Sequence, residues 1–161
     1  MEATALLTKD HAKVKALFKK FEAAGDRAGQ TKQHLFNEIR QELAVHAGIE
    51  EEIFYPAMQK VRSKATKDLV LEALEEHQVV KTLLKEIAGL PPGDDDFDGM
   101  VKVLQENVEH HAGEEEKEMF PQAKEHLSEE RRASLGEQME GRKKELKPRT
   151  ARTSAWSPTA W

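Results

Sequence analysis

Two segments of the chain carry the same polar residues at the same spacing. The sequence reads HAGIEEEIFYP from His46 and HAGEEEKEMFP from His111, and six of these eleven positions are identical. In both segments a glutamate follows the histidine by four residues, which gives the pairs His46–Glu50 and His111–Glu115. Residues four apart share one face of a helix, so each imidazole and its carboxylate can reach the same point. Nitrogen and carboxylate ligands that converge in this way are typical of a metal site.

The repeat extends to two further histidines. Asp10–His11 precedes His46 by 35 residues, and Glu76–His77 precedes His111 by 34 residues. The chain therefore divides into two similar halves, each with one single histidine and one His-x-x-x-Glu pair. Such halves predict two helical hairpins related by pseudo-twofold symmetry.

Four segments show the apolar period of amphipathic helices. Inward positions recur at steps of three and four over residues 7–21, 39–53, 70–87 and 97–119. All six histidines and glutamates of the repeat occupy these apolar stripes. They are His11, His46, Glu50, His77, His111 and Glu115.

Polar residues on these stripes require a compensating partner. A buried carboxylate without one costs several kcal/mol, and no lysine or arginine lies on the four stripes. A single histidine on an apolar stripe is more often a hydrogen-bonded core residue than a ligand. Four helices that each place a histidine inward, two of them with a glutamate, instead favour a metal site.

Periodicity also separates these residues from their neighbours. The repeat pairs His46 with His111 rather than with His110, which falls on another face of its helix. We expect a solvated acidic rim to be formed by Glu51, Glu52, Glu114 and Glu116, and we expect His34 and His126 to be surface residues.

The number of ligands predicts two metals rather than one. Four imidazoles and two carboxylates exceed the four ligands that zinc prefers, but they give each of two metals two histidines and both glutamates as bridges. This mixture of nitrogen and oxygen suits iron, with manganese or zinc as alternatives. Asp10 and Glu76 either orient the imidazoles or are surface acids. Tyr55 is a proton or electron donor or a packing residue, and Phe120 at the repeated position favours packing.

Composition predicts an all-α protein, because helix formers dominate and strand-like alternation is nearly absent. We expect an antiparallel up-and-down four-helix bundle over residues 1–127. An accessory C-terminal helix is expected over residues 128–146, capped by Ser128, and a basic flexible tail over 147–161. Pro56 and Pro121 are expected to kink or end their helices.

Charge and hydropathy restrict the partners. Residues 1–141 carry about −10 and the chain from Arg142 onward carries +5, so the acidic body argues against nucleic-acid binding. No stretch approaches the roughly 20 apolar residues needed to cross a membrane. A start without a signal-like segment and a chain without cysteine predict a cytoplasmic protein. Trp156 and Trp161 leave open a protein partner that binds through the tail.

These motifs resemble those of the hemerythrin-like family, also called the HHE cation-binding domain. The resemblance rests on DHAKVKALF, HAGIEEEIFYP, EHQVVKTLL and HHAGEEEKEMFP, which occur in order over about residues 5–126. It implies a four-helix bundle around two non-haem iron ions with an oxo or hydroxo bridge. The ligands it implies are His11, His46, Glu50, His77, His111 and Glu115.

The sequence differs from the oxygen-carrying hemerythrins at two positions. Those proteins have a second histidine four residues after that of the third helix, where this chain has Lys81, and an aspartate where it has Glu115. A more symmetric site suits peroxide decomposition or redox defence at least as well as oxygen storage. The alternative is a module that binds or senses oxygen, iron or nitric oxide without turnover.

Overall fold

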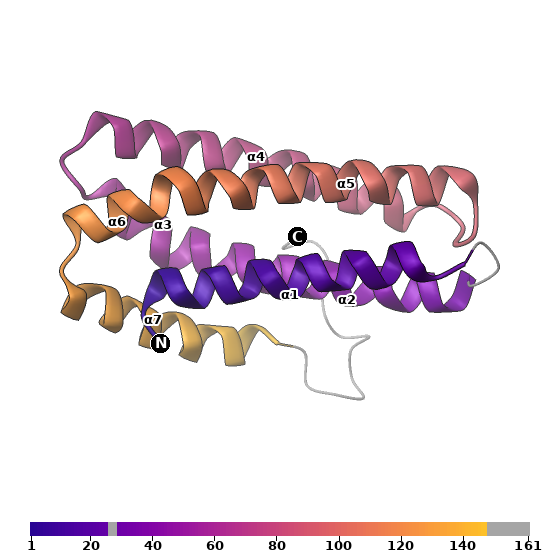
Figure 1. The fold of residues 1–161 in the computed structure, drawn as a ribbon, viewed down its shortest axis with the longest axis horizontal. Helices are drawn as coiled ribbons and strands as arrows, with labels where there is room; N and C mark the ends of the chain where they lie inside the picture. Colours follow the sequence, from indigo (N-terminus) through magenta and orange to yellow (C-terminus); the bar gives the residue numbers. More distant parts are fainter. Residues whose placement is uncertain (26–28, 148–161) are drawn as a thin grey trace.

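The computed structural model describes residues 1–25 and 29–147, and all regular structure within these ranges is helical. Four long helices run antiparallel along the molecule (Figure 1). They are α1 (Ala3–Ala23), α2 (Gly29–Ile49), α4 (Lys64–Ala88) and α5 (Asp95–Glu114). The hairpins α1–α2 and α4–α5 turn at the same end of the bundle, as Figure 1 shows. The predicted all-α four-helix bundle is confirmed.

At the start of several helices, a polar side chain accepts a hydrogen bond from a backbone N–H group that has no partner within the helix. Ser63 accepts from Thr66 at the start of α4, and Asp94 accepts from Asp96 at the start of α5. Before Asp94, Gly93 adopts a φ of 87°, which only glycine adopts readily. Within the described ranges, no helix is long and apolar enough to cross a membrane.

Each helix that carries a His-x-x-x-Glu pair continues through a π-helical turn. The turns are η1 (Glu50–Phe54) and η2 (Glu115–Met119), followed by the helices α3 (Tyr55–Gln59) and α6 (Phe120–His126). Of the two alternatives expected at the prolines, a kink or an end, the helix does not end, because Pro56 and Pro121 lie inside helical paths. Proline has no N–H and its ring would clash with the carbonyl four residues earlier in an α-helix. Hydrogen bonds from Tyr55 and Phe120 to the carbonyls five residues earlier widen the turn just before each proline.

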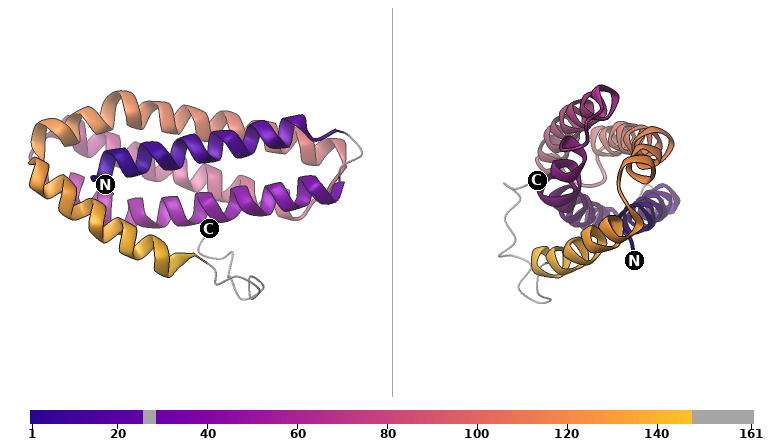
Figure 2. Two further views of the ribbon diagram at one scale, coloured as in Figure 1. Left: turned by 60° about the horizontal axis from the view of Figure 1, so that its bottom comes forward. Right: turned by 90° about the vertical axis from the view of Figure 1, so that its left-hand side faces the viewer.

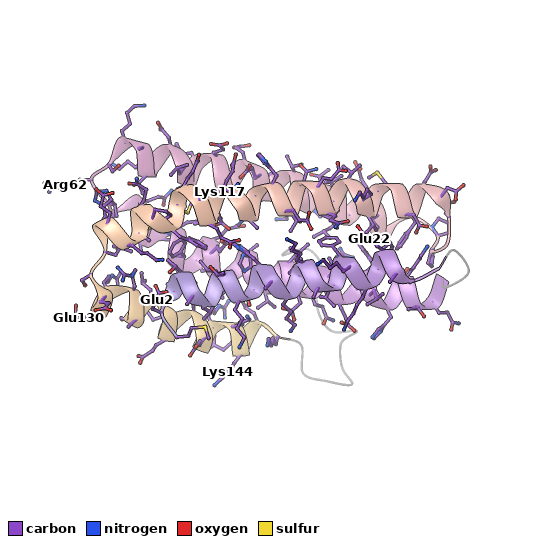
Figure 3. All side chains as sticks on the ribbon, viewed as in Figure 1. Glu2, Glu22, Arg62, Lys117, Glu130 and Lys144 are labelled. Atoms are coloured by element: carbon purple, nitrogen blue, oxygen red, sulfur yellow. The ribbon has the colours of Figure 1, made fainter. Side chains whose placement is uncertain are left out.

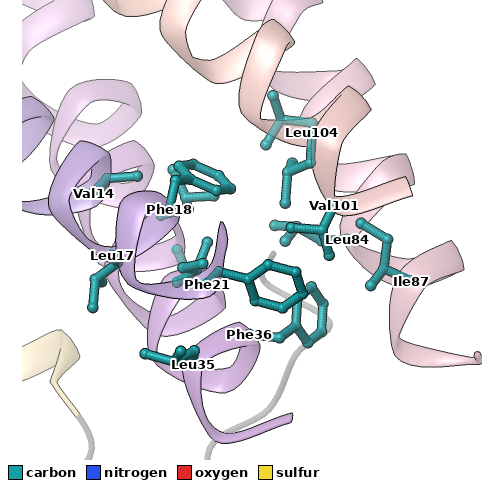
Figure 4. Close-up of a cluster of buried hydrophobic side chains, with 14 of the residues drawn as sticks. Val14, Leu17, Phe18, Phe21, Leu35, Phe36, Leu84, Ile87, Val101 and Leu104 are labelled. Carbon is teal, nitrogen blue, oxygen red and sulfur yellow. The ribbon is translucent and has the colours of Figure 1, made fainter. Parts of the chain in front are cut away.

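Two apolar cores fill the bundle, one on each side of the polar residues. The cluster towards the hairpin turns includes Phe18, Phe36 and Leu104, and Figure 4 shows its side chains converging from all four long helices. The cluster at the other end includes Phe54 and Met58. The repeated histidines and glutamates lie on the same helices between these clusters, so apolar packing encloses them from both ends.

A last helix, α7 (Glu129–Leu146), packs outside the bundle beside α1 and α2 (Figure 2). Leu135 and Met139 are buried and Leu146 is half-buried, so these side chains form the face of α7 that packs against the bundle. A Cβ at Gly136 would lie 2.0 Å from the carbonyl oxygen of Met1, so only glycine allows this close approach. Figure 3 shows charged side chains such as Lys144 projecting from the outer surface. The predicted basic tail lies outside the described residues from position 148 onward.

Candidate metal centre

The structure brings together all six residues that the repeat singled out. Their side-chain atoms form two groups in which the nitrogen and oxygen atoms lie within 4.8 Å of one another. The first group contains His11, His46, Glu50 and Glu115, and the second contains Glu50, His77 and His111.

The two glutamates lie between the histidine pairs. Glu50 Oε1 is 3.2 Å from Nε2 of both His46 and His77, which belong to different hairpins. Glu115 Oε1 is likewise 3.1 Å from Nε2 of His11 and 3.4 Å from Nε2 of His111. Each carboxylate therefore contacts one histidine from each half, as residues that bridge two cations would do.

A second layer of carboxylates holds the other nitrogen of every imidazole. Each Nδ1 atom lies within hydrogen-bond distance of one carboxylate oxygen. The four pairs are His46 with Asp10 (3.0 Å), His111 with Glu76 (2.7 Å), His77 with Glu51 (2.7 Å) and His11 with Glu116 (3.2 Å). An ionised carboxylate can only accept, so each Nδ1 donates its proton. In the neutral imidazole the lone pair of each Nε2 then faces the centre, which is the tautomer that metal ligation requires.

These contacts decide two questions that the sequence left open and correct one expectation. Asp10 and Glu76 hold imidazoles and are not merely surface acids. Glu51 and Glu116, which were expected in a solvated rim, also contact imidazoles, although both remain partly exposed. Both follow a bridging glutamate by one residue, and this shared position in the repeat was the available signal.

A family model, the Hemerythrin HHE cation binding domain, matches residues 2–123. The chain belongs to this family. It is therefore a hemerythrin-like cation-binding domain, with histidine and glutamate groups that could hold metal.

The chain is also similar to individual proteins. An uncharacterised hemerythrin-like protein of Schizosaccharomyces pombe is 29% identical over 136 residues, covering 84% of this chain and 66% of the relative. A Nostoc protein named DNA nickase is 30% identical over 140 residues, covering 87% of this chain but 38% of the relative. This chain thus spans less than two thirds of either relative. The crystal structure of an HHE cation-binding domain-containing protein from Mycobacterium kansasii has a TM-score of 0.79 at 27% identity, and the match covers 91% of this chain and 87% of that one.

Tyr55 fits both interpretations that the sequence left open. Its ring is buried in the apolar core, and its hydroxyl donates a 2.6 Å hydrogen bond to Glu115 Oε2. The same oxygen is 3.1 Å from Nε2 of His77 and 3.4 Å from Nε2 of His111. Burial, together with the charges of Glu50 and Glu115, raises the pKa of Tyr55 well above its usual value, so the hydroxyl keeps its proton.

Burial, together with Glu50 and Glu115, sets the protonation of the metal-free hemerythrin-like centre. Burial lowers the pKa of His77, but the nearby carboxylates of Glu50 and Glu51 outweigh this effect and raise the pKa to about 9. The pKa of His46 is also raised well above its usual value, because the charge of Glu50 outweighs the effect of burial. Protons therefore offset the carboxylate charge where cations would otherwise do so.

A cavity of about 360 Å³ lies between α1 and α5 and reaches all four histidines. Its walls are mainly apolar and include Val14, Phe18 and Val108. Thr8 and Lys15 on α1 and Glu109 on α5 also line it. The cavity is large enough to admit small molecules to the hemerythrin-like centre.

Proposed function

We propose that this chain is a non-haem di-iron protein that binds small oxygen species and decomposes hydrogen peroxide. The observation that carries the proposal is the environment of Glu50, which is 0% exposed. Among the described residues, none donates a hydrogen bond of normal geometry to either of its carboxylate oxygens. An ionised carboxylate in the interior is stable only when it is paired or coordinates a metal. Two bound cations would satisfy Glu50 and Glu115 together.

The donor set fits iron. Four Nε2 atoms and two carboxylates would hold two ions, with manganese or zinc as the alternatives that metal analysis must exclude. Two iron ions, when bound, would supply Lewis acidity and electrons. Two hydrogen peroxide molecules give one dioxygen and two waters, so the overall reaction consumes no external reductant.

The chain itself would provide access, orientation and a proton. The apolar cavity between α1 and α5 admits a small molecule while it excludes most bulk water. The outer carboxylates fix the imidazoles, and Tyr55 holds a proton at its hydroxyl beside Glu115. The acidic charge of residues 1–141 argues against nucleic acid as a substrate of this chain.

Oxygen evolution tests the proposal. The iron-loaded protein should hold two iron ions and release dioxygen from hydrogen peroxide. Glu50→Ala should lose both properties, whereas His34→Ala, a change at an exposed histidine, should retain them. Two bound ions without oxygen release would favour the alternative, a module that binds or senses oxygen, iron or nitric oxide. A protein that retains no metal would overturn both functions.

A further inference from the structure

Helix α7 reaches the hemerythrin-like centre through one side chain. Lys143 donates a hydrogen bond to Oδ1 of Asp10, while Oδ2 of Asp10 accepts from Nδ1 of His46. Asp10 is only 3% exposed, so this connection runs through the interior. Two consecutive hydrogen bonds therefore join a helix outside the bundle to an inner histidine.

The other half of the repeat lacks this connection. Glu76 occupies the place of Asp10 and accepts from His111 through Oε1, while its Oε2 lies 3.8 Å from Nε2 of the exposed His110. Within residues 1–25 and 29–147, no lysine or arginine forms an ion pair with Glu76. The two repeated carboxylates are thus held differently, one by a lysine and one without it.

Lys143 is also distinct among the charged residues of α7. The neighbouring Arg142 pairs with the exposed Glu52, and Arg132 pairs with Glu2, which is partly exposed. Of the ion pairs described for α7, only that of Lys143 has a buried acidic partner. An exposed pair contributes little to docking, whereas a pair with a buried carboxylate offsets a charge that solvent cannot stabilise.

We propose that Lys143 is a positioning residue for His46, acting through Asp10, and that α7 is therefore part of the metal-binding machinery. The inference rests on the metal-binding function proposed above. Lys143 holds one oxygen of Asp10, which leaves the other directed at Nδ1 of His46 and fixes the plane of that imidazole. Nε2 of His46 then points toward the metal position formed by the first group of residues, which also contains His11, Glu50 and Glu115. The second position has no equivalent dependence on α7.

Metal binding to the full chain tests this inference, with Co²⁺ as a spectroscopic probe. Wild-type protein should bind two Co²⁺ ions with visible absorption from both. Lys143→Met keeps an unbranched stem of similar length but removes the charge, and should weaken one binding step by about 10–100-fold, leaving the other unchanged. Lys143→Arg should restore that step in part. Lys144→Met, on the exposed side of the same helix, serves as the matched control.

A double-mutant cycle separates positioning from docking of α7. If Lys143 acts through Asp10, the variant Asp10→Asn/Lys143→Met should bind no more weakly than Asp10→Asn alone. Additive losses, an equal loss in Lys144→Met, or unchanged affinities in Lys143→Met would each overturn the inference. Failure of the proposed function looks different, because the wild-type protein would then bind no Co²⁺.

Discussion

The two halves of the hemerythrin-like centre have the same inner residues but different surroundings. In the first half, the ring of Phe120 stacks on that of His11, with 5.9 Å between the ring centroids. Lys143 donates a hydrogen bond to Asp10 in the same half. Beside His77 of the second half, the ring at the equivalent position of the repeat is that of Tyr55. The centroids of these two rings are 5.3 Å apart, and Tyr55 brings a hydroxyl to the centre. The comparison shows that similar inner residues can have different environments, because the groups behind the imidazoles set their orientation and the local charge.

The largest expected effect comes from the residue that both halves share. Glu50→Ala should reduce the bound metal from two ions to none, because its carboxylate contacts one histidine of each pair. Quantitative metal analysis after dialysis measures this loss. His11→Ala provides the contrast, since it removes a ligand of the first group only and should leave one ion bound. Retention of both ions in Glu50→Ala would show that Glu50 does not bridge.

The metal-free protein should lose stability as the pH rises. Because the pKa of His77 is about 9 when folded and near 6.5 when unfolded, its contribution is fully present below pH 6.5 and is lost towards pH 9. The loss is on the order of 3 kcal/mol, or roughly 6–12 °C in melting temperature. Thermal melts between pH 6 and 9.5 measure it. His77→Gln should flatten this dependence and His34→Gln should not; equal slopes in both variants would contradict the assignment.

Removing the hydroxyl of Tyr55 makes the two halves more alike. Tyr55→Phe should lower the free energy of unfolding of the metal-free protein by about 1.5–3 kcal/mol, because the hydrogen bond to buried Glu115 is lost. Denaturant titration measures this change. A Tyr55→Phe protein with unchanged stability would indicate that packing alone determines this position.

The smallest effects are expected for Glu51 and Glu116, the carboxylates that contact an imidazole of the opposite hairpin. Glu51→Gln should weaken one metal-binding step about tenfold, because Glu51 holds His77 at 2.7 Å. Glu116→Gln should have a smaller effect, because Glu116 holds His11 at 3.2 Å and is 42% exposed. Co²⁺ titrations of the two variants provide the comparison. The reverse order of effects would show that distance and exposure do not rank these partners.

The helices and the six inner residues could be predicted because the evidence lies within single helices. Apolar steps of three and four residues define each stripe, and the repeat distinguishes His111 from His110 without any other sequence. Partners across hairpins could not be found in this way. Glu51 contacts His77 of α4, and spacing along a helix says nothing about which residue of another hairpin it meets.

The π-helical turns explain a further difference between sequence and structure. Counting three residues from Glu50 predicts Ile53 on the inward stripe, but the structure buries Phe54 completely and leaves Ile53 half-buried. The wider turn moves the inward position by about one residue. For Tyr55 the repeat favours packing, since its counterpart Phe120 carries no hydroxyl and the repeat gives no sign of one.

The same turns make each helix sensitive to length at one point. A π-helical turn holds one residue more than an α-helical hydrogen-bonded turn, and each residue of an α-helix advances by about 100°. Deleting the exposed Glu52 would let this segment wind as an ordinary α-helix and rotate everything beyond it by about that angle. Tyr55 would then turn away from the histidines, and Met58 would leave the core. A one-residue deletion in a loop between hairpins would change only the loop. Here the deletion would rotate every helical residue beyond it relative to the rest of the bundle.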